Sequence, residues 1–341
     1  MKILFNSIVN QPVKPAELKS KASANIHSAA DSLKISFKGS SMEIFTFDNF
    51  DIKKYIIENF LIKDMSEKDF TDATVKNCKL EGNMKAVKFF HTSIFKLKCQ
   101  DNTDLTNANF SATQIVDSKF SGTLSDADFS GADIWKTSFE NCTAKNTKFN
   151  YLDWNKNNCR FYQLEFTDSD FSNAEFNCAN FERVTMKKTD FKEAKFNNAI
   201  INYMDAQDIS FSKADFSGAD IDSEIPYSDF SSSDFTEAKF NNATINHLTA
   251  VNANFTRADF TGATLNNVEA KDANFTGADF TGAKVNNLDL RNANLTNAIG
   301  LDKITRIEGG MVAVSNKTIM PDGKPATKQW ADAHNFTFIQ V

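Results

Sequence analysis

The stretch ANFTRADFTGATLNNVEAKDANFTGADFTGAKVNNLDL, residues Ala253–Leu290, decides the fold of this chain. Its second half repeats the words of the first half 20 residues later, and an apolar residue recurs at every fifth position throughout. A period of five is neither the 3.6 residues of an α-helix nor the two-residue alternation of an ordinary strand. The pattern therefore predicts a chain that turns every five residues, so that four turns close a square coil.

Each five-residue unit directs two side chains inward. If the Phe or Leu position is called i, position i−2 is usually Ala, position i−1 is Asp or Asn, and position i+1 is Ser, Thr or Asn. Most Phe residues from Phe95 to Phe280 obey this lattice, with slips in register after Phe120, Trp154 and Ile221. We expect Phe to stack on Phe along two faces of the coil.

On every fourth face the large and small residues exchange places. Position i is small at Ala206, Ala250 and Ala270, and position i−2 is enlarged to Met204, Leu248 and Val268. A close-packed interior demands such compensation of volume within a layer. One corner carries Asn202, Asp222, Asn246, Asn266 and Asn286 in successive coils, which predicts a ladder of side-chain hydrogen bonds along the stack. A polar recognition stripe is the alternative interpretation of the same residues.

The words ADFSG at Ala127–Gly131 and Ala214–Gly218, and ADFTG at Ala258–Gly262 and Ala278–Gly282, resemble the motif of the pentapeptide-repeat family over about residues 65–298. The resemblance implies an all-β solenoid, a right-handed quadrilateral parallel β-helix. Its length predicts about 11–12 coils, stacked about 4.8 Å apart. Such proteins generally bind other proteins and have no active site.

Both ends of the chain lack the repeat, as a solenoid with capped ends requires. Residues 1–64 are expected to form a partly helical extension or cap, with a helix over 15–35, a strand over 41–47, and either a helix or an entry coil over 51–62.

Residues 299–341 are expected to form a C-terminal cap of a hairpin and a short helix. The expected elements are short strands at Met311–Val314 and Thr318–Met320, a turn at Pro321-Asp322-Gly323, and a helix over Thr327–His334 that lays Trp330 on the last coil. The terminal caps are also candidate surfaces for a homodimer.

Composition narrows the classes of function. The 341 residues carry a net charge of −6, which argues against direct nucleic-acid binding, and no apolar run is long enough to span a bilayer. The five cysteines form no CxxC pair, and Cys78, Cys142 and Cys159 occupy slots otherwise filled by Ala, so we interpret them as small buried thiols. The four histidines lie far apart in the sequence. We therefore assign no catalytic, cofactor or metal-binding residue, expect no small-molecule substrate, and classify the chain as a non-enzyme.

Two features are candidate interaction sites. A four-residue excess between Ile221 and Phe230 predicts a loop at Ser223, Glu224, Ile225, Pro226 and Tyr227, because Pro226 cannot donate to a strand ladder. Residues 201–250 contain nine acidic residues against two lysines. The candidate acidic patch consists of Asp208, Asp215, Asp220, Asp222, Asp229, Asp234 and Glu237. By contrast, residues 65–100 contain seven lysines against four acidic residues.

Three functions fit these features. The first is a rigid rod that presents a wall and the inserted loop to a protein partner. The second is a bacterial effector, in which the Ser-, Ala- and Lys-rich first 40 residues act as a secretion signal that is not cleaved. The third is a DNA mimic that binds DNA gyrase, as some members of the pentapeptide-repeat family do. The expected location is the bacterial cytoplasm or, for an effector, a host cell.

Overall fold

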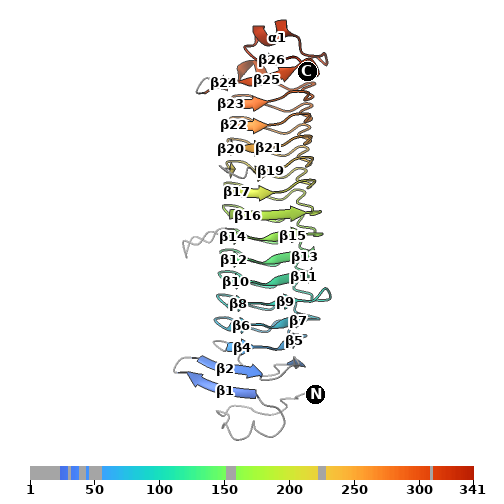
Figure 1. Ribbon diagram of the computed structural model, residues 1–341. Helices are drawn as coiled ribbons and strands as arrows, with labels where there is room; N and C mark the ends of the chain where they lie inside the picture. The colour runs from blue at the N-terminus through green and yellow to red at the C-terminus, as the bar shows by residue number, and fades with distance from the viewer. Residues whose placement is uncertain are drawn as a thin grey trace. The chain divides into compact units, whose positions relative to one another are not determined.

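The computed structural model describes residues 56–150, 159–221, 228–307 and 310–341 in full, and the backbone alone of 24–29, 32–37 and 44–45. The chain divides into two compact units, Met1–Cys159 and Arg160–Val341. In each unit short parallel strands stack one above another, as Figure 1 shows.

Two walls of the first unit are ladders of parallel strands. The first wall contains β4 (Ile56–Glu58), β6 (Thr74–Lys76), β8 (Ser93–Phe95), β10 (Gln114–Val116) and β12 (Asp133–Trp135). The second wall contains β5 (Leu61–Lys63), β7 (Lys79–Glu81), β9 (Lys98–Cys99), β11 (Lys119–Thr123) and β13 (Ser138–Thr143). Single bridging residues, such as Asn83 with Asp104 and Asp69 with Lys88, join the coils on the third and fourth walls.

The second unit repeats this arrangement. Its first wall contains β14 (Arg160–Tyr162), β16 (Asn180–Lys187), β17 (Ile200–Asp205), β18 (Asp220–Ile221), β20 (Thr244–Asn246), β22 (Thr264–Glu269), β23 (Lys284–Asp289) and β24 (Thr305–Arg306). The longer strands continue into the second wall, which also holds β15 (Glu165–Thr167), β19 (Ser228–Asp229), β21 (Leu248–Thr249), β25 (Val312–Ser315) and β26 (Thr337–Ile339). Counted from β4 onward, the first wall has five described strands in the first unit and eight in the second. These 13 strands exceed the 11–12 coils expected, because strands also lie outside residues 65–298.

Each corner of the coil is a residue with left-handed backbone conformation. In one coil φ is 57° at Arg257, 69° at Gly262, 52° at Asn267 and 59° at Asp272. A side chain other than that of Gly, Asn or Asp costs about 1–2 kcal/mol in this region. The frequent Asn, Asp and Gly at the last position of the repeat therefore lower the free-energy cost of turning every five residues.

A local hydrogen bond explains the Asp or Asn at position i−1. Oδ1 of Asp259 accepts hydrogen bonds from the backbone N (2.9 Å) and the hydroxyl (2.5 Å) of Thr261. Oδ1 of Asn274 accepts the same pair from Thr276, at 3.1 and 2.6 Å. Such bonds two residues along the chain close a turn. The polar residues of the repeat thus specify the corners of the coil.

Stacked phenylalanine rings fill the interior. In the second unit one ladder joins Phe176, Phe196, Phe216, Phe240, Phe260 and Phe280, with ring centroids 4.6–5.2 Å apart and planes within 8° of parallel. A second ladder joins Phe171, Phe191, Phe211, Phe235, Phe255 and Phe275 at 4.8–5.6 Å. The predicted stacking along two faces is confirmed in this unit. In the first unit Phe70, Phe89, Phe110, Phe129 and Phe149 form one ladder at 4.6–5.0 Å.

The predicted exchange of large and small residues is also confirmed. Met204, Leu248 and Val268 are buried, as are the alanines two positions after each of them. The last coil departs from the exchange, because Leu288 and Leu290 are both large and both buried.

The prediction of a helix over residues 15–35 is wrong for the part whose backbone is described. β1 (Ala24–Ala29) and β2 (Ser32–Phe37) form an antiparallel hairpin, and β2 pairs in parallel with β4. The apolar residues of SLKISF alternate with a period of two, and this strand pattern outweighs the helix propensity of the neighbouring Ala and Lys. β3 (Ile44–Phe45) lies within the predicted strand. β4 and β5 show that residues 56–63 form a coil of the stack and not a second helix.

At the C-terminal end the predicted turn and helix are confirmed. The two predicted strands do not pair as a hairpin, because β25 pairs in parallel with β23 and β26, and Ile319 bridges Asn294 and Pro325. Gly323 has φ 78° and donates from its backbone N to Met320 O at 2.9 Å, which closes the turn. A short 3₁₀ segment, η3 (Leu301–Lys303), precedes β24. α1 (Lys328–Ala333) begins after Thr327, whose hydroxyl accepts a hydrogen bond from Trp330 N. The Trp330 ring stacks on His334 at 3.9 Å and meets Phe336 edge-on at 5.3 Å.

Candidate interaction surfaces

The predicted loop lies outside the described residues. Ser223, Glu224, Ile225, Pro226 and Tyr227 belong to the undescribed segment 222–227, and so does Asp222 of the predicted acidic patch. Its ends are β18 on the first wall and β19 on the second wall of the second unit. The loop therefore stays a prediction.

The described members of the predicted acidic patch are distributed around the coil. Asp220 lies on the first wall, Asp229 on the second, Asp234 on the third and Asp215 on the fourth, while Asp208 and Glu237 are corner residues with positive φ. One coil visits all four walls within about 20 residues, so a run of acids in the sequence is spread over the perimeter. The structure does not gather these carboxylates on one face.

Nearby cations and turn contacts engage several of these acids. Glu237 lies 3.6 Å from Lys213 Nζ and 3.4 Å from Arg257 Nη1, and Asp215 lies 3.9 Å from Lys239 Nζ. Burial opposes ionisation of Asp215, but hydrogen bonds from Ser217 and other neighbours outweigh it, so the pKa of this carboxyl is lowered. These groups stabilise the coils that carry them.

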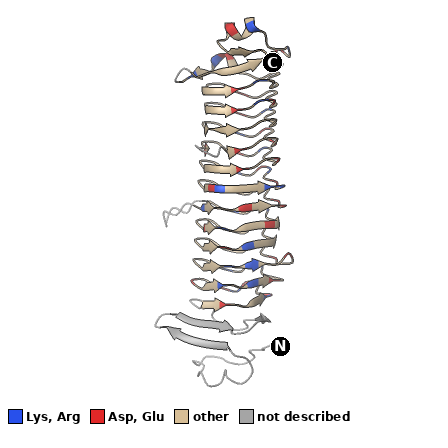
Figure 2. Ribbon diagram, in the orientation of Figure 1, with Lys and Arg blue, Asp and Glu red and all other residues tan. Residues whose placement is uncertain are grey.

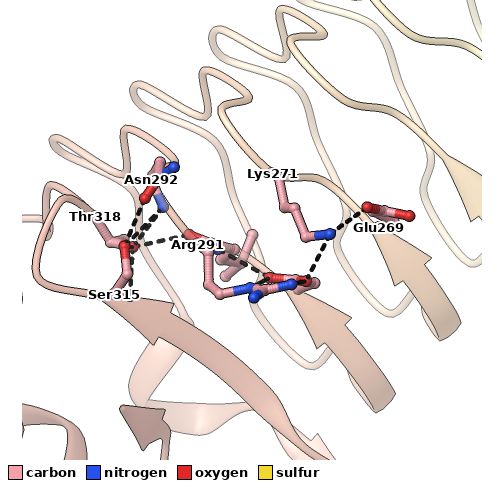
Figure 3. Close-up of polar contacts among 8 residues, drawn as sticks. Glu269, Lys271, Arg291, Asn292, Ser315 and Thr318 are labelled. Atoms are coloured by element: carbon pink, nitrogen blue, oxygen red, sulfur yellow. Dashed lines mark hydrogen bonds and ion pairs between the residues drawn. The ribbon is translucent and has the colours of Figure 1, made fainter. Parts of the chain in front are cut away.

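A denser polar network lies at the C-terminal end of the second wall, as Figure 3 shows. Lys271 Nζ lies 2.5 Å from Glu269 and 3.7 Å from Asp289, and Arg291 Nη2 lies 2.6 Å from Asp289. Burial opposes ionisation of Asp289, but hydrogen bonds from Arg291 and the charges of Arg291 and Lys271 lower its pKa overall. The charges are mutually neutralised, so this network binds adjacent coils to each other.

Hydrogen bonds from two hydroxyl groups join the last coil to the cap. Ser315 Oγ donates to Asn292 Oδ1 at 2.8 Å, and Thr318 Oγ1 donates to Leu290 O at 2.9 Å (Figure 3). Ser315 and Thr318 are fully buried. Their hydrogen bonds add to strand pairing that continues into the cap, because β25 pairs with both β23 and β26.

Within the described coils of the second unit, the interior offers little room for a ligand. A cavity of about 20 Å³ in the second unit is lined by apolar side chains, including Leu248, Phe255 and Val268. That volume suits about one water molecule, and an apolar lining leaves such a water without partners. Among the described residues no group of His, Cys, Asp and Glu side chains is arranged to hold a metal ion. The thiols of Cys78, Cys142 and Cys159 are buried, as predicted.

Polar ladders run along the outer side of the first wall through β20, β22 and β23 of the second unit. Asn266 Nδ2 donates to Asn246 Oδ1 at 2.6 Å, which confirms that part of the predicted ladder. A parallel ladder that the sequence did not predict runs along the adjacent corner, where Asn287 Nδ2 donates to Asn267 Oδ1 at 2.8 Å and Asn267 Nδ2 lies 3.1 Å from His247 Nε2.

The same wall of the first unit is different. At the position that Asn246 and Asn266 hold, strand register aligns Phe95, Val116 and Trp135. The sequence lattice placed Phe95 at the inward position i, and this is wrong, because Ile94 is buried and Phe95 is partly exposed. Sequence reasoning therefore missed this surface, although Val116 and Trp135 are apolar residues at i+1, where the repeat has Ser, Thr or Asn. In Figure 2 blue segments mark lysines on the neighbouring strands β7, β9 and β11.

Comparison with known proteins supports the interpretation of this sequence as pentapeptide repeats. Models of pentapeptide repeats match residues 124–153, 165–202 and 189–223 in eight copies, and a second such model matches residues 250–294 in nine copies. No curated protein matches the chain at a significant level. No helix in the described part of the chain is long and apolar enough to cross a lipid bilayer.

Among solved structures, HetL from the cyanobacterium Nostoc sp. strain PCC 7120, a pentapeptide repeat protein involved in regulating heterocyst differentiation, is 19% identical with a TM-score of 0.56. The match covers 64% of this chain and 92% of HetL. QnrB1, a plasmid-mediated fluoroquinolone resistance protein, is 17% identical over 76% of this chain and 94% of its own, with a TM-score of 0.24. The expected fold class, a right-handed quadrilateral parallel β-helix, is confirmed.

Proposed function

Because this chain is a pentapeptide-repeat protein, we propose that it is a non-enzymatic scaffold that binds another protein on the outside of its coils. The observation that carries the proposal is the filled interior. Rings such as Phe196 and Phe216, stacked at 4.6 Å and fully buried, fill the space enclosed by the described coils, so a binding partner can reach only the outer surface. Recognition is therefore left to the side chains at i−1, i+1 and the corners.

Rigidity supports the same role. Backbone hydrogen bonds join successive coils on every wall, for example Phe235 N to Asn254 O at 2.7 Å and Lys239 N to Ala214 O at 2.9 Å. A surface held in this way keeps its shape on binding, which reduces the entropy lost when a partner docks.

The alternative of a DNA mimic draws less support from the charges. A mimic of duplex DNA needs a continuous acidic surface, whereas the described acids point to all four walls. Glu237, Asp215 and Asp289 also have basic neighbours within 4 Å. No described feature bears on delivery into a host cell.

The test is the capture of a stoichiometric partner. The intact chain is cross-linked in its own cells, and each captured protein is purified and titrated against the chain by calorimetry. We expect at least one partner that binds with fixed stoichiometry and without turnover. A second chain, in which Ser223–Tyr227 is replaced by a Gly-Ser segment of equal length, shows whether the predicted loop takes part. A purified chain that binds no captured protein, or that converts a small molecule, contradicts the proposal.

A further inference from the structure

We propose that the corner between the first and second walls of the first unit binds an acidic amphipathic helix of a partner protein. This inference rests on the scaffold function and names its surface and its class of partner. The surface, called here the Lys–aromatic corner, consists of Lys76, Lys79, Phe95, Lys96, Lys98, Val116, Lys119, Trp135 and Lys136.

The apolar part of this corner is an outward-facing ladder. Phe95 pairs in register with Val116, and Val116 pairs with Trp135, so the three side chains lie on successive coils of the first wall. Trp135 is 40% exposed, which is unusual for the largest apolar side chain. Phe95 and Val116 are partly exposed. Trp is the residue most enriched at the energetic centres of protein interfaces.

This ladder is not what the fold needs at that position. The equivalent outward position of the second unit carries Asn246 and Asn266, whose side chains hydrogen-bond to each other at 2.6 Å. The Asn ladder stabilises the stack and tolerates water. Three apolar side chains at the same repeat position leave apolar surface exposed, and such surface typically marks a binding site.

The flanking lysines define the charge of the partner. On the second wall Lys98 pairs in register with both Lys79 and Lys119, so three lysines hold equivalent positions on successive coils. Like charges directly opposite each other are destabilising. Lys119 pairs with Glu140, whereas Lys79 and Lys98 form no ion pair with any described residue.

Three further lysines surround the apolar ladder. Lys76 Nζ lies 5.7 Å from the centre of the Phe95 ring, Lys96 lies 3.9 Å from Asp117, and Lys136 is exposed beside Trp135. A partner with carboxylates on both sides of an apolar ridge would match this arrangement, and it would relieve the repulsion among the stacked lysines.

The backbone of the wall favours a helix as the bound element. The amide of Lys96 donates to Val116 O at 2.9 Å and that of Asp117 donates to Trp135 O at 3.0 Å, so these groups are already paired between coils. A partner strand would find no free edge here, whereas a helix satisfies its own backbone. The spacing also agrees: two coils span about 9.6 Å, and seven residues of helix rise about 10.5 Å.

Fluorescence anisotropy with the intact chain tests the assignment. The probe is a fluorescein-labelled 20-residue helical peptide with Leu along one face, Glu on both flanks of that face and Ala elsewhere. Three comparison probes are the same peptide with Lys in place of Glu, a peptide of the same composition with scattered Leu, and a single strand of 20 thymidines. We expect saturable binding of the acidic amphipathic peptide at least tenfold tighter than that of any comparison probe.

Single variants locate the binding. Trp135→Ser and Lys98→Glu are each expected to weaken peptide binding at least tenfold. The matched controls Ile200→Ser and Lys284→Glu, an exposed apolar residue and an exposed lysine of the second unit, should change it less than twofold. Circular dichroism and the thermal midpoint verify that every variant is folded.

Three results would overturn the inference. They are equal binding of the scattered-Leu or Lys peptide, unchanged binding by Trp135→Ser and Lys98→Glu, and tighter binding of the thymidine strand, which would assign the corner to single-stranded nucleic acid.

The partner found by cross-linking separates this inference from the scaffold function. If that partner still binds Trp135→Ser and Lys98→Glu with unchanged affinity, the proposed scaffold function is retained and the proposal that the Lys–aromatic corner is the binding site is rejected. If neither the native chain nor the variants bind any captured protein, the scaffold itself fails.

Discussion

Replacing Phe216 with Ala is expected to lower the free energy of unfolding by about 4 kcal/mol, in the usual range for deleting a fully buried ring. Phe216 is 0% exposed and stacks on Phe196 at 4.6 Å and on Phe240 at 5.1 Å, with interplanar angles of 3° and 6°. It also meets Phe211 edge-on at 5.5 Å. The cavity left by the ring cannot collapse, because stacked coils above and below fix the wall.

The position of a ring along the ladder should change how much unfolding free energy is lost when that ring is removed. Phe280 is equally buried but stacks on one ring alone, Phe260, at 5.2 Å, because Gly300 takes the next lattice position of the described chain. An aromatic pair contributes about 0.5–1.5 kcal/mol beyond burial of its area. We therefore expect Phe280→Ala to cost about 1 kcal/mol less than Phe216→Ala.

Urea unfolding followed by far-ultraviolet circular dichroism and by tryptophan fluorescence measures both variants. Repeat proteins unfold in part when nearest-neighbour contacts are weakened, so the two probes must coincide before a single free energy is extracted. A loss below about 1 kcal/mol for Phe216→Ala, or a larger loss for Phe280→Ala, would refute the conclusion that continuous ring stacking stabilises the interior.

Three further outcomes are expected. Asn266→Ala removes a side-chain hydrogen bond to Asn246 and should lower unfolding free energy by about 1 kcal/mol in the same urea assay, an effect that an unchanged midpoint would contradict. The folded-state pKa of Asp289 is lowered although burial opposes this, so its ionised form adds stability above the unfolded pKa, and that stability is lost as pH falls through the folded value. The difference in stability between Asp289→Asn and the native chain should therefore be present at pH 7 and should shrink as the pH falls below the unfolded value of about 3.9. Burial raises the pKa of Cys78 to about 12, so iodoacetamide at pH 8 should modify the half-buried Cys178 of the folded chain and spare Cys78, as peptide mass spectrometry would show.

The sequence alone determined the interior. The five-residue lattice through Phe255 and Phe260 predicted the four-walled coil, and the exchange between Leu248 and Ala250 predicted how volume is shared within a layer. These features are local and repeated, and each inward residue lies where burial favours an apolar side chain. The buried residues of a periodic sequence can therefore be predicted from the sequence itself.

The ends were harder to predict because they lack the repeat. The helix expected over residues 15–35 gave way to β1 and β2, whose backbone pairs with each other and continues to β4. Helix propensity is a weak local preference, and pairing with an existing strand ladder overrides it.

Only the tertiary structure decided which outward side chains lie together. Phe95 and Val116 are 21 residues apart and Val116 and Trp135 are 19 apart, yet strand register places all three in one ladder. The acids of residues 201–250 are close in sequence, and the coil sends Asp215, Asp220 and Asp234 to different walls. Outward positions are not constrained by burial, and coil length varies by a residue or more, so neighbours on the surface follow from the register of stacked strands and not from distance along the chain.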